Sequence, residues 1–395
     1  MKQSTIFTIA AALFVSTSAV AQINYPSTPK DNTVDVYFGE KVADPYRWLE
    51  DDTSEKTAQW VEAENKLTRD YLNSIPMRAK ILKRLKETAN FEKFGIPFEK
   101  NGKWYVHRND GLQNQYVLYQ MDRPDSPVKE QRVWLDPNKL STDGTVALKG
   151  THFSNNGRYM AYVISRSGSD WEEIYVKDCQ TGNDLQDHIL WAKFTNVTWL
   201  GDGFYYSAYD APEKGKETSA KNSVQKIYYH KIGTPQTDDQ LFYMNPTQPL
   251  RFYGVSVNKD ETVMFLTESG MDNGNNLFVR DLTKPNSQFI QMCANPKYIY
   301  STVQTVGDKI YILTNAEAPK YRLMQADLKH PGYNEWREVV PEGESVLEDV
   351  TFADDRMILQ YAKDNCTRSP WERRARCSCP KPCRSYRQRW ARCRR

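Results

Sequence analysis

The segment Asn156-Gly157-Arg158-Tyr159-Met160-Ala161-Tyr162-Val163 decides the fold, because the same kind of unit recurs along most of the chain. It joins a turn to an aromatic strand, and a polar loop and a second strand, 173–178, follow it. Similar units begin near residues 102, 203, 260, 308 and 355, so that the repeats are 46 to 57 residues apart. A period in this range, with alternating strands, indicates the blades of a β-propeller.

A second strand is predicted after each of the first five turns. We call the strand that directly follows each turn an anchor strand, and the five predicted partners are residues 116–119, 174–176, 226–229, 276–280 and 321–324. The sixth anchor strand, near 355, has no predicted partner, because residues 361–365 lead directly into an Arg- and Cys-rich tail. The pattern therefore predicts a mainly β protein, an incomplete propeller of about five and a half blades.

Composition excludes some classes of function. The chain has 395 residues, 39% hydrophobic and 12% aromatic, which is enough to bury a large core. Residues 368–395 carry a net charge of +10 against +3 for the whole chain, so the remaining residues sum to −7. This mildly acidic body offers no basic stripe, and we expect no nucleic-acid partner.

The N-terminus has the parts of a secretory signal. Lys2 precedes the apolar run 6–15, and Ala19-Val20-Ala21 has the form of a cleavage site. A membrane anchor is the alternative, but ten apolar residues are too few to span a bilayer. We expect residues 1–21 to be cleaved after Ala21, export to a periplasm or to the outside, and no membrane span.

Two amphipathic helices are predicted in residues 22–90, ahead of the repeats. The segment 52–55 has the spacing of a capping box, and a helix with one apolar face follows it. A second helix begins around Pro76. The predicted apolar faces consist of Trp60, Ala63, Leu67 and Tyr71 in the first helix and of Met77, Ile81, Leu85 and Ala89 in the second.

Two motifs carry a resemblance to a known family. Asp44-Pro45-Tyr46-Arg47-Trp48-Leu49-Glu50-Asp51 and Ser167-Gly168-Ser169-Asp170-Trp171 resemble segments of the prolyl oligopeptidases, which are serine peptidases, and the similarity runs from about Tyr25 to about Asn365. In that family a seven-bladed propeller caps an α/β-hydrolase domain that cleaves short peptides after proline. The resemblance implies short proline-containing peptides as partners. It also implies that the helical segment and the propeller pack on a hydrolase domain.

The sequence does not contain the catalytic residues that this chemistry needs. Nucleophilic hydrolysis on the hydrolase fold requires a Ser in a G-x-S-x-G turn, followed by an acid and a His. The nearest segment, 254–258, lacks the second Gly, and Ser256 is predicted to lie in a strand. The family's catalytic residues lie beyond the resemblance, so we assign no catalytic residue, expect the α/β-hydrolase domain to be absent, and predict that the chain is inactive as printed.

Part of the substrate-facing surface remains assignable by resemblance. Phe194 corresponds to an aromatic residue that in the family reaches from the propeller towards the bound peptide. Met271 corresponds to a position where some relatives have a Cys near the active site. The alternatives are that Phe194 belongs to the core of a blade and that Met271 is a loop contact.

No metal or cofactor site is predicted in the repeats. The acidic residues form the pairs 51–52, 238–239 and 354–355, in each of which the two residues are adjacent in sequence. Adjacent side chains in a strand point to opposite faces. We therefore interpret these pairs as solvated charges in turns. No Gly-rich phosphate loop is present. Cys179 and Cys293 are isolated from each other, and we favour buried free thiols over a disulfide.

The tail, residues 367–395, differs in composition from the repeats in 91–366. It could be a zinc cluster of Cys377, Cys379, Cys383 and Cys393, or an arginine-rich arm for nucleic acid. The Cys spacing differs from that of common zinc sites, and an arginine arm has little use on an exported protein. We favour translation in a wrong frame, because the composition changes inside a repeat. The leading hypothesis is thus a prolyl oligopeptidase cut short before its catalytic domain, and the alternative is a catalytically dead propeller that binds a peptide or protein.

Overall fold

The computed structural model describes residues 23–353, 356–363 and 366–368. The predicted signal sequence and most of the predicted tail lie outside the described residues. The described residues divide into two compact units, one of residues 23–88 with 212–220 and the other of residues 89–211 with those from 221 onward. The segment 212–220, which the repeat pattern places among the blades, belongs to the N-terminal unit, where Thr218 Oγ1 donates a hydrogen bond to the carbonyl of Glu50 at 3.3 Å.

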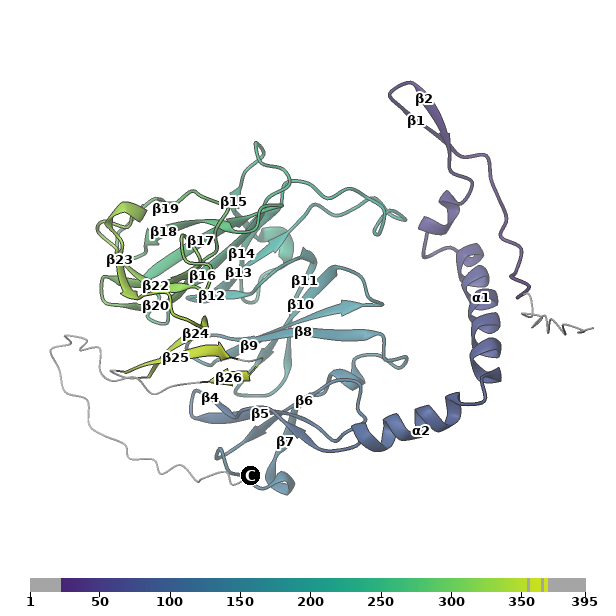
Figure 1. The fold of residues 1–395 in the computed structure, drawn as a ribbon, viewed down its shortest axis with the longest axis horizontal. Helices are drawn as coiled ribbons and strands as arrows, with labels where there is room; N and C mark the ends of the chain where they lie inside the picture. The colour runs from purple at the N-terminus through teal and green to yellow at the C-terminus, as the bar shows by residue number, and fades with distance from the viewer. Residues whose placement is uncertain (1–22, 354–355, 364–365, 369–395) are drawn as a thin grey trace, which may run out of the picture. The chain divides into compact units, whose positions relative to one another are not determined.

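The N-terminal unit contains a hairpin and two helices (Figure 1). Its elements are β1 (Val34–Tyr37), β2 (Glu40–Ala43), η1 (Arg47–Glu50), α1 (Glu55–Ser74) and α2 (Arg78–Ala89). The predicted capping box is shifted, because Ser54 is the N-cap of α1 and its Oγ accepts a hydrogen bond from the Thr57 amide at 3.1 Å. Pro76 lies before α2 rather than in its first turn.

The family-like motif in residues 44–51 connects the hairpin to α1. Arg47 Nε donates to the Asp44 carboxylate at 2.6 Å, and its guanidinium also pairs with Asp35 in β1. Trp48 lies under the ammonium group of Lys56, which is 4.0 Å from the ring centroid. One short motif thus holds the hairpin, the 3-10 turn and the start of α1 together.

The second unit is built from antiparallel sheets that follow one another along the chain. The first sheet and its connections contain β3 (Lys93–Phe94), β4 (Phe98–Lys100), β5 (Lys103–Asn109), β6 (Val117–Met121), η2 (Val128–Glu130), β7 (Arg132–Leu135) and η3 (Pro137–Lys139). The eight-stranded sheet contains β8 (Val146–Phe153), β9 (Tyr159–Arg166), β10 (Trp171–Asp178), β11 (Asp184–Lys193), β12 (Thr198–Leu200), β13 (Gly203–Ala208), β14 (Lys226–Lys231) and β15 (Gln240–Met244), and the 3-10 turn η4 (Gln236–Asp238) connects β14 to β15.

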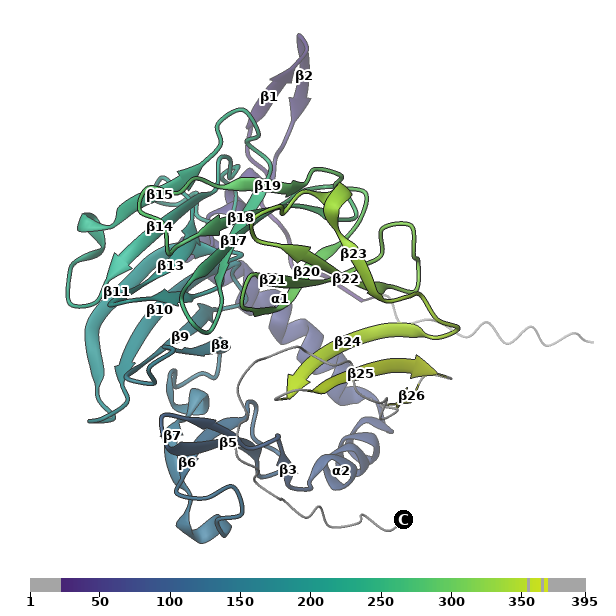
Figure 2. The same ribbon diagram turned by 90° about the vertical axis from the view of Figure 1, so that its left-hand side faces the viewer.

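Three smaller sheets complete this unit. Two are four-stranded. One contains β16 (Phe252–Val257), β17 (Val263–Ser269), β18 (Asn275–Asp281) and β19 (Ile290–Cys293). The other contains β20 (Tyr300–Val306), β21 (Lys309–Thr314), β22 (Arg322–Asp327) and β23 (Arg337–Val340), with the 3-10 turn η5 (Tyr333–Glu335) between β22 and β23. The third contains β24 (Val346–Ala353), β25 (Arg356–Lys363) and β26 (Cys366–Arg368). Figure 2 shows the sheets of this unit following one another around an arc in chain order.

The eight-stranded sheet is two four-stranded meanders with a narrow connection. Strands β11 and β13 pair through a single residue pair, Ala192 with Ala208, whereas β13 and β14 pair over six. The five predicted partner strands coincide with β6, β10, β14, β18 and β22. The mainly β propeller class is thus confirmed, while the number of blades stays a prediction.

The core lies between consecutive sheets. Five clusters of buried side chains lie between consecutive groups of strands. The first three join the first sheet to β8 and β9, the β9–β11 strands to β12 and β13, and the β13–β15 strands to β16 and β17. The last two join the β17–β19 strands to β20–β22, and β21 and β22 to β24 and β25. The anchor strands β9 and β13 are almost entirely buried, because each is covered by a neighbouring sheet on both faces. Each large apolar side chain buried in this way contributes about 1.5–3 kcal/mol.

The last sheet differs from the sequence-based expectation. Strand β26 pairs antiparallel with β25, with Tyr361 opposite Arg368, so the sixth anchor strand does have a partner. The prediction was wrong because it relied on side-chain composition, whereas strand pairing is made by backbone groups that every residue but proline supplies. Thr367 and Arg368, which we assigned to the aberrant tail, belong to this strand.

Candidate functional site

The strands of the second unit place the loops at two ends. Strand β9 leaves the turn at 155–158, runs eight residues, and reaches the loop 167–170 about 25 Å away. Trp171 then pairs with Lys193 at the end of β11, and Phe252 at the start of β16 pairs with Ser269 at the end of β17. We call the end that carries Trp171, Phe194 and Met271 the loop end, and the opposite end the turn end.

Phe194 lies on the surface of the loop end. It follows β11 directly, has a positive φ of 51°, and its side chain is 55% exposed. Its ring meets the ring of Phe252 edge to face, with centroids 5.3 Å apart and an interplanar angle of 87°. The alternative that Phe194 belongs to the core of a blade is therefore wrong. Its contact with peptide stays a prediction.

Met271 lies in the loop between β17 and β18 and is 93% exposed. Its neighbour Asp272 accepts a hydrogen bond from Arg251 Nη1 at 2.5 Å, and Arg251 Nε also lies 3.7 Å from the Glu268 carboxylate. Since Arg251 directly precedes Phe252, this ion pair joins the loop of Met271 to the ring that contacts Phe194. The two sequence-predicted residues therefore belong to one end of neighbouring strands.

Further aromatic and charged side chains surround Phe194. The ammonium group of Lys193 lies 5.0 Å from the ring centroid of Trp171 and 5.5 Å from that of Phe194, and 3.7 Å from the carboxylate of Asp170. Trp171 and Asp170 come from the second family-like motif, so that motif and Phe194 lie together. Lys193 and Phe252 carry no signal of their own in the sequence, although Lys193 directly precedes Phe194.

Glu172 lies beneath this surface. Glu172 is 8% exposed, and one of its carboxylate oxygens accepts a hydrogen bond from the Thr195 amide at 3.2 Å. Burial raises the pKa of Glu172, while the hydrogen bond from Thr195 lowers it. Glu172 thus holds the backbone directly after Phe194.

A histidine with two carboxylate partners lies inside the eight-stranded sheet. His230 is fully buried, with Nδ1 2.7 Å from Asp239 and Nε2 3.0 Å from Asp187. Burial disfavours the charged imidazole, but the hydrogen bonds to the two carboxylates outweigh burial and raise the pKa of His230 to about 9. Both ring nitrogens are thus engaged by acids, an arrangement unlike that of a general base beside a nucleophilic serine.

Asp239 corrects one sequence-based interpretation. We assigned the pair 238–239 to solvated turn charges, yet the Asp239 side chain is only 2% exposed. It also accepts a hydrogen bond from the Tyr206 hydroxyl at 2.7 Å. The expectation failed because its partners come from β13 and β14, which the local pattern does not reveal.

Other residues that the sequence singled out are placed as follows. Ser256 lies in β16 and is exposed, as predicted for a strand residue. Cys179 and Cys293 are free, and burial raises the pKa of each thiol to about 12. Within residues 23–353, 356–363 and 366–368 we find no group of three or more His, Cys, Asp or Glu placed to hold a metal ion. Neither helix among the described residues is long and apolar enough to cross a membrane.

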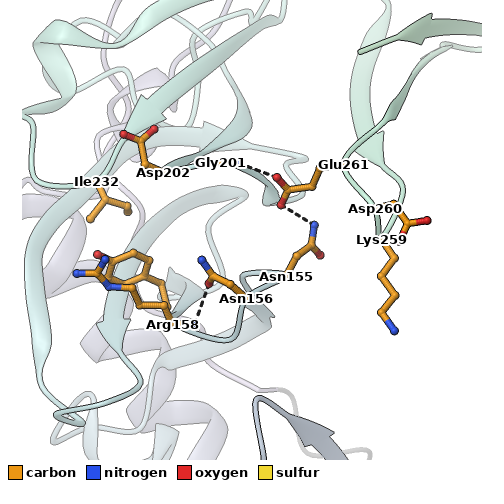
Figure 3. A pocket seen from close by; sticks show the side chains of 10 residues that line it. Asn155, Asn156, Arg158, Gly201, Asp202, Ile232, Lys259, Asp260 and Glu261 are labelled. Carbon is orange, nitrogen blue, oxygen red and sulfur yellow. Dashed lines mark hydrogen bonds between the residues drawn. The ribbon is translucent and has the colours of Figure 1, made fainter. Parts of the chain in front are cut away.

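The turn end contains a polar pocket of about 690 Å³ (Figure 3). Glu261 connects three turns there, since its carboxylate accepts hydrogen bonds from Asn155 Nδ2 at 2.9 Å and from the Gly201 amide at 3.2 Å. Arg158 and Lys259 bring positive charge, and Asp202 and Asp260 bring negative charge. The two hydrogen bonds of Glu261 thus hold the neighbouring turns together.

The sheets that pack face to face in chain order define a β-propeller protein. Residues 26–368 match the family model described as the prolyl oligopeptidase N-terminal beta-propeller domain. The chain therefore belongs to this family, and the resemblance found in the sequence is confirmed.

Relatives of known name agree with the family. The chain is 38% identical over 361 residues to a prolyl endopeptidase of Elizabethkingia meningoseptica, covering 90% of this chain and 50% of the relative. It is 32% identical over 377 residues to prolyl oligopeptidase A of Amanita bisporigera, covering 86% of this chain and 49% of the relative. The chain thus spans about half the length of these relatives.

Solved structures show the same fold. One, from a study of two prolyl endopeptidases and the role of inter-domain dynamics, has a TM-score of 0.63 at 34% identity and covers 87% of this chain and 50% of the other. Another is prolyl oligopeptidase B of Galerina marginata bound to a 35mer hydrolysis and macrocyclization substrate, with a TM-score of 0.70 at 29% identity. That match covers 86% of this chain and 51% of the other.

Proposed function

We propose that this chain is the propeller portion of an exported serine endopeptidase of the prolyl oligopeptidase type, and that its loop end contacts short proline-containing peptides. The observation that carries the proposal is the family match over residues 26–368, together with relatives that are prolyl endopeptidases. The exposed ring of Phe194 and the exposed side chain of Met271 support the assignment of the contact surface to the loop end.

The helical segment has apolar side chains that suit a large apolar partner. Tyr71, Ile81 and Leu85 are each more than half exposed. We propose that they pack on an α/β-hydrolase domain, as the family resemblance implies. Apolar faces of this kind are normally buried against a neighbour.

We propose that the chain as printed does not hydrolyse peptides. Supporting this, both ring nitrogens of the buried His230 are bonded to carboxylates, which leaves neither nitrogen to act as a base on a serine. The test is to incubate the purified full chain with a fluorogenic peptide that ends in Gly-Pro. We expect no turnover, and turnover that a serine-directed inhibitor abolishes would contradict the proposal.

Peptide contact is tested separately, by titrating the full chain with acetyl-Ala-Gly-Pro-amide. We expect weak, saturable binding that the Phe194→Ala variant loses about tenfold, as for truncation of an aromatic contact residue. Equal affinity of the wild-type chain and the Phe194→Ala variant for the peptide would show that the loop end is not the contact surface.

Export is tested by expressing the full chain in a bacterial host and sequencing the N-terminus of the periplasmic product. We expect the product to begin at Gln22. Retention of Met1 in the cytoplasm would contradict the export proposal.

A further inference from the structure

The pocket at the turn end contains an arginine that lies against a fixed aromatic stack. The guanidinium carbon of Arg158 is 4.9 Å from the ring centroid of Tyr159. The Tyr159 ring in turn stacks on Trp199, with centroids 5.9 Å apart and an interplanar angle of 14°. Trp199 is 5% exposed, and its Nε1 donates to the carbonyl of His152 at 2.9 Å. The position of the Arg158 side chain is therefore supported by groups anchored in the core.

The backbone of Arg158 is also fixed, but its charge is not paired. Its amide donates to Asn156 Oδ1 at 3.0 Å, and its carbonyl accepts from the Cys179 amide at 2.8 Å. Arg158 is exposed, and among the residues that the structure describes no carboxylate lies within 4 Å of it. The carboxylate of Asp178, which is within electrostatic range, is bound by amides of its own turn. A preorganised guanidinium of this kind suits a carboxylate, which it binds through two parallel hydrogen bonds.

Glu261 is the negatively charged counterpart in the same pocket. Both of its hydrogen bonds come from neutral donors, the side chain of Asn155 and the amide of Gly201. Within the described part of the chain, no Lys, Arg or His nitrogen lies within 4 Å of its carboxylate. A carboxylate has about four acceptor sites, so Glu261 keeps room for a positively charged donor. Asp202 differs, because Lys231 pairs with it at 3.3 Å.

We propose that this pocket binds a small zwitterion, a molecule with a free carboxylate for Arg158 and a free ammonium group for Glu261. Figure 3 shows Arg158 and Ile232 on one side of the pocket and Glu261 nearer to its centre, which gives the two ligand charges separate places. The volume of about 690 Å³ is in the range of small-molecule sites. Free amino acids and short peptides with unblocked termini have this charge pattern.

The charges around the pocket favour a zwitterion over a simple anion. Two positive side chains, Arg158 and Lys259, line it together with three negative ones, Asp202, Asp260 and Glu261. A phosphate with two negative charges meets an excess of like charge there, whereas a ligand of zero net charge does not. The inference uses no residue of the loop end, so it does not rest on the proposed function.

The test is calorimetric titration of the full chain with the dipeptide Gly-Leu, with acetyl-Gly-Leu, with Gly-Leu-amide and with inorganic phosphate. We expect weak, saturable binding of Gly-Leu. Each blocked dipeptide should bind at least about tenfold more weakly, because it lacks one of the two charged hydrogen-bonding groups. Phosphate should bind more weakly than Gly-Leu. No binding of Gly-Leu, equal affinity for the three dipeptides, or tighter binding of phosphate would overturn the inference.

Variants locate the binding. Arg158→Gln should weaken Gly-Leu binding by about tenfold or more and leave the affinity for Gly-Leu-amide nearly unchanged. Its urea midpoint should stay close to that of wild type, because the side chain is exposed. Arg132→Gln is the matched control, since Arg132 is an exposed arginine of β7 that pairs with Asp122 at 3.1 Å, and it should leave Gly-Leu binding unchanged. Wild-type affinity for Gly-Leu in Arg158→Gln would overturn the inference.

A last comparison separates this site from the loop end. Phe194→Ala should bind Gly-Leu as wild type does, and a loss of binding in this variant would place the dipeptide at the loop end and overturn the inference. Failure of the fully blocked acetyl-Ala-Gly-Pro-amide to bind would contradict only the proposed peptide contact, because that probe carries neither charged terminus.

Discussion

Replacing Asp239 by asparagine is expected to destabilise the chain below pH 7 and to have little effect above about pH 9. The reason is that the buried imidazole of His230 lies between the carboxylates of Asp187 and Asp239, and both carboxylates stabilise its charged form. Asparagine keeps an oxygen that can accept the hydrogen bond from Tyr206 but removes one negative charge. If that oxygen faces Tyr206, the amide NH2 faces His230 Nδ1, so the change removes the charge together with the hydrogen-bond acceptor for the imidazole.

The magnitude follows from the pKa of His230, which is raised from its ordinary 6.5 to about 9. At 1.36 kcal/mol per pKa unit this corresponds to about 3 kcal/mol. Because the folded pKa lies above the unfolded one, this stability is fully present below about pH 6.5 and is lost as the pH rises to about 9. Loss of one of two carboxylates should remove about 1.5–3 kcal/mol at pH 6 and much less at pH 9.5.

The assay is urea unfolding of the full chain at pH 6 and pH 9.5, followed by tryptophan fluorescence. His188→Gln is the matched control, since His188 is exposed and pairs with Glu173 alone, and an exposed pair contributes about 0–1 kcal/mol. An Asp239→Asn effect of equal size at both pH values would refute the reasoning. So would a larger loss in His188→Gln than in Asp239→Asn at pH 6.

Three further outcomes are expected. Ile174→Ala should lower the free energy of unfolding by about 2–5 kcal/mol, because the side chain is fully buried between sheets, and a urea midpoint close to wild type would contradict this. Cys293 should resist a thiol reagent at pH 8 until the chain unfolds, since burial raises the pKa of its thiol to about 12; rapid labelling of the folded chain would show that it is accessible. Glu261→Ala should speed hydrogen exchange of the Gly201 amide and cost about 1–2 kcal/mol, and unchanged exchange would mean that Glu261 does not hold these turns together.

The repeat was readable in the sequence because each anchor strand depends on local signals. Gly157 has a φ of +65°, which a glycine adopts without strain, and the aromatic and β-branched residues that follow it are buried in β9. A turn of this kind, followed by a buried strand and its partner strand, gives a residue pattern that recurs along the sequence. This is why all five predicted partner strands were found.

The site could be predicted only in part, because its geometry depends on residues distant in the chain. The backbone beside Phe194 is bound by the side chains of Gln225, 32 residues from Lys193, and of Glu172. Gln225 has no local signal in the sequence, and its second partner lies 28 residues away. Family resemblance pointed to Phe194 and Met271, whereas the neighbours that hold Phe194 in place come together only in the folded chain.

The most direct test of the central claim is to locate a bound proline peptide on the full chain. A short peptide with a photoreactive phenylalanine analogue two residues before proline is cross-linked to the protein, and the labelled residues are mapped by mass spectrometry. The account predicts labelling at the loop end, at Phe194, Phe252 or Met271. Labelling confined to the turn end, around Asn155 and Glu261, would contradict it.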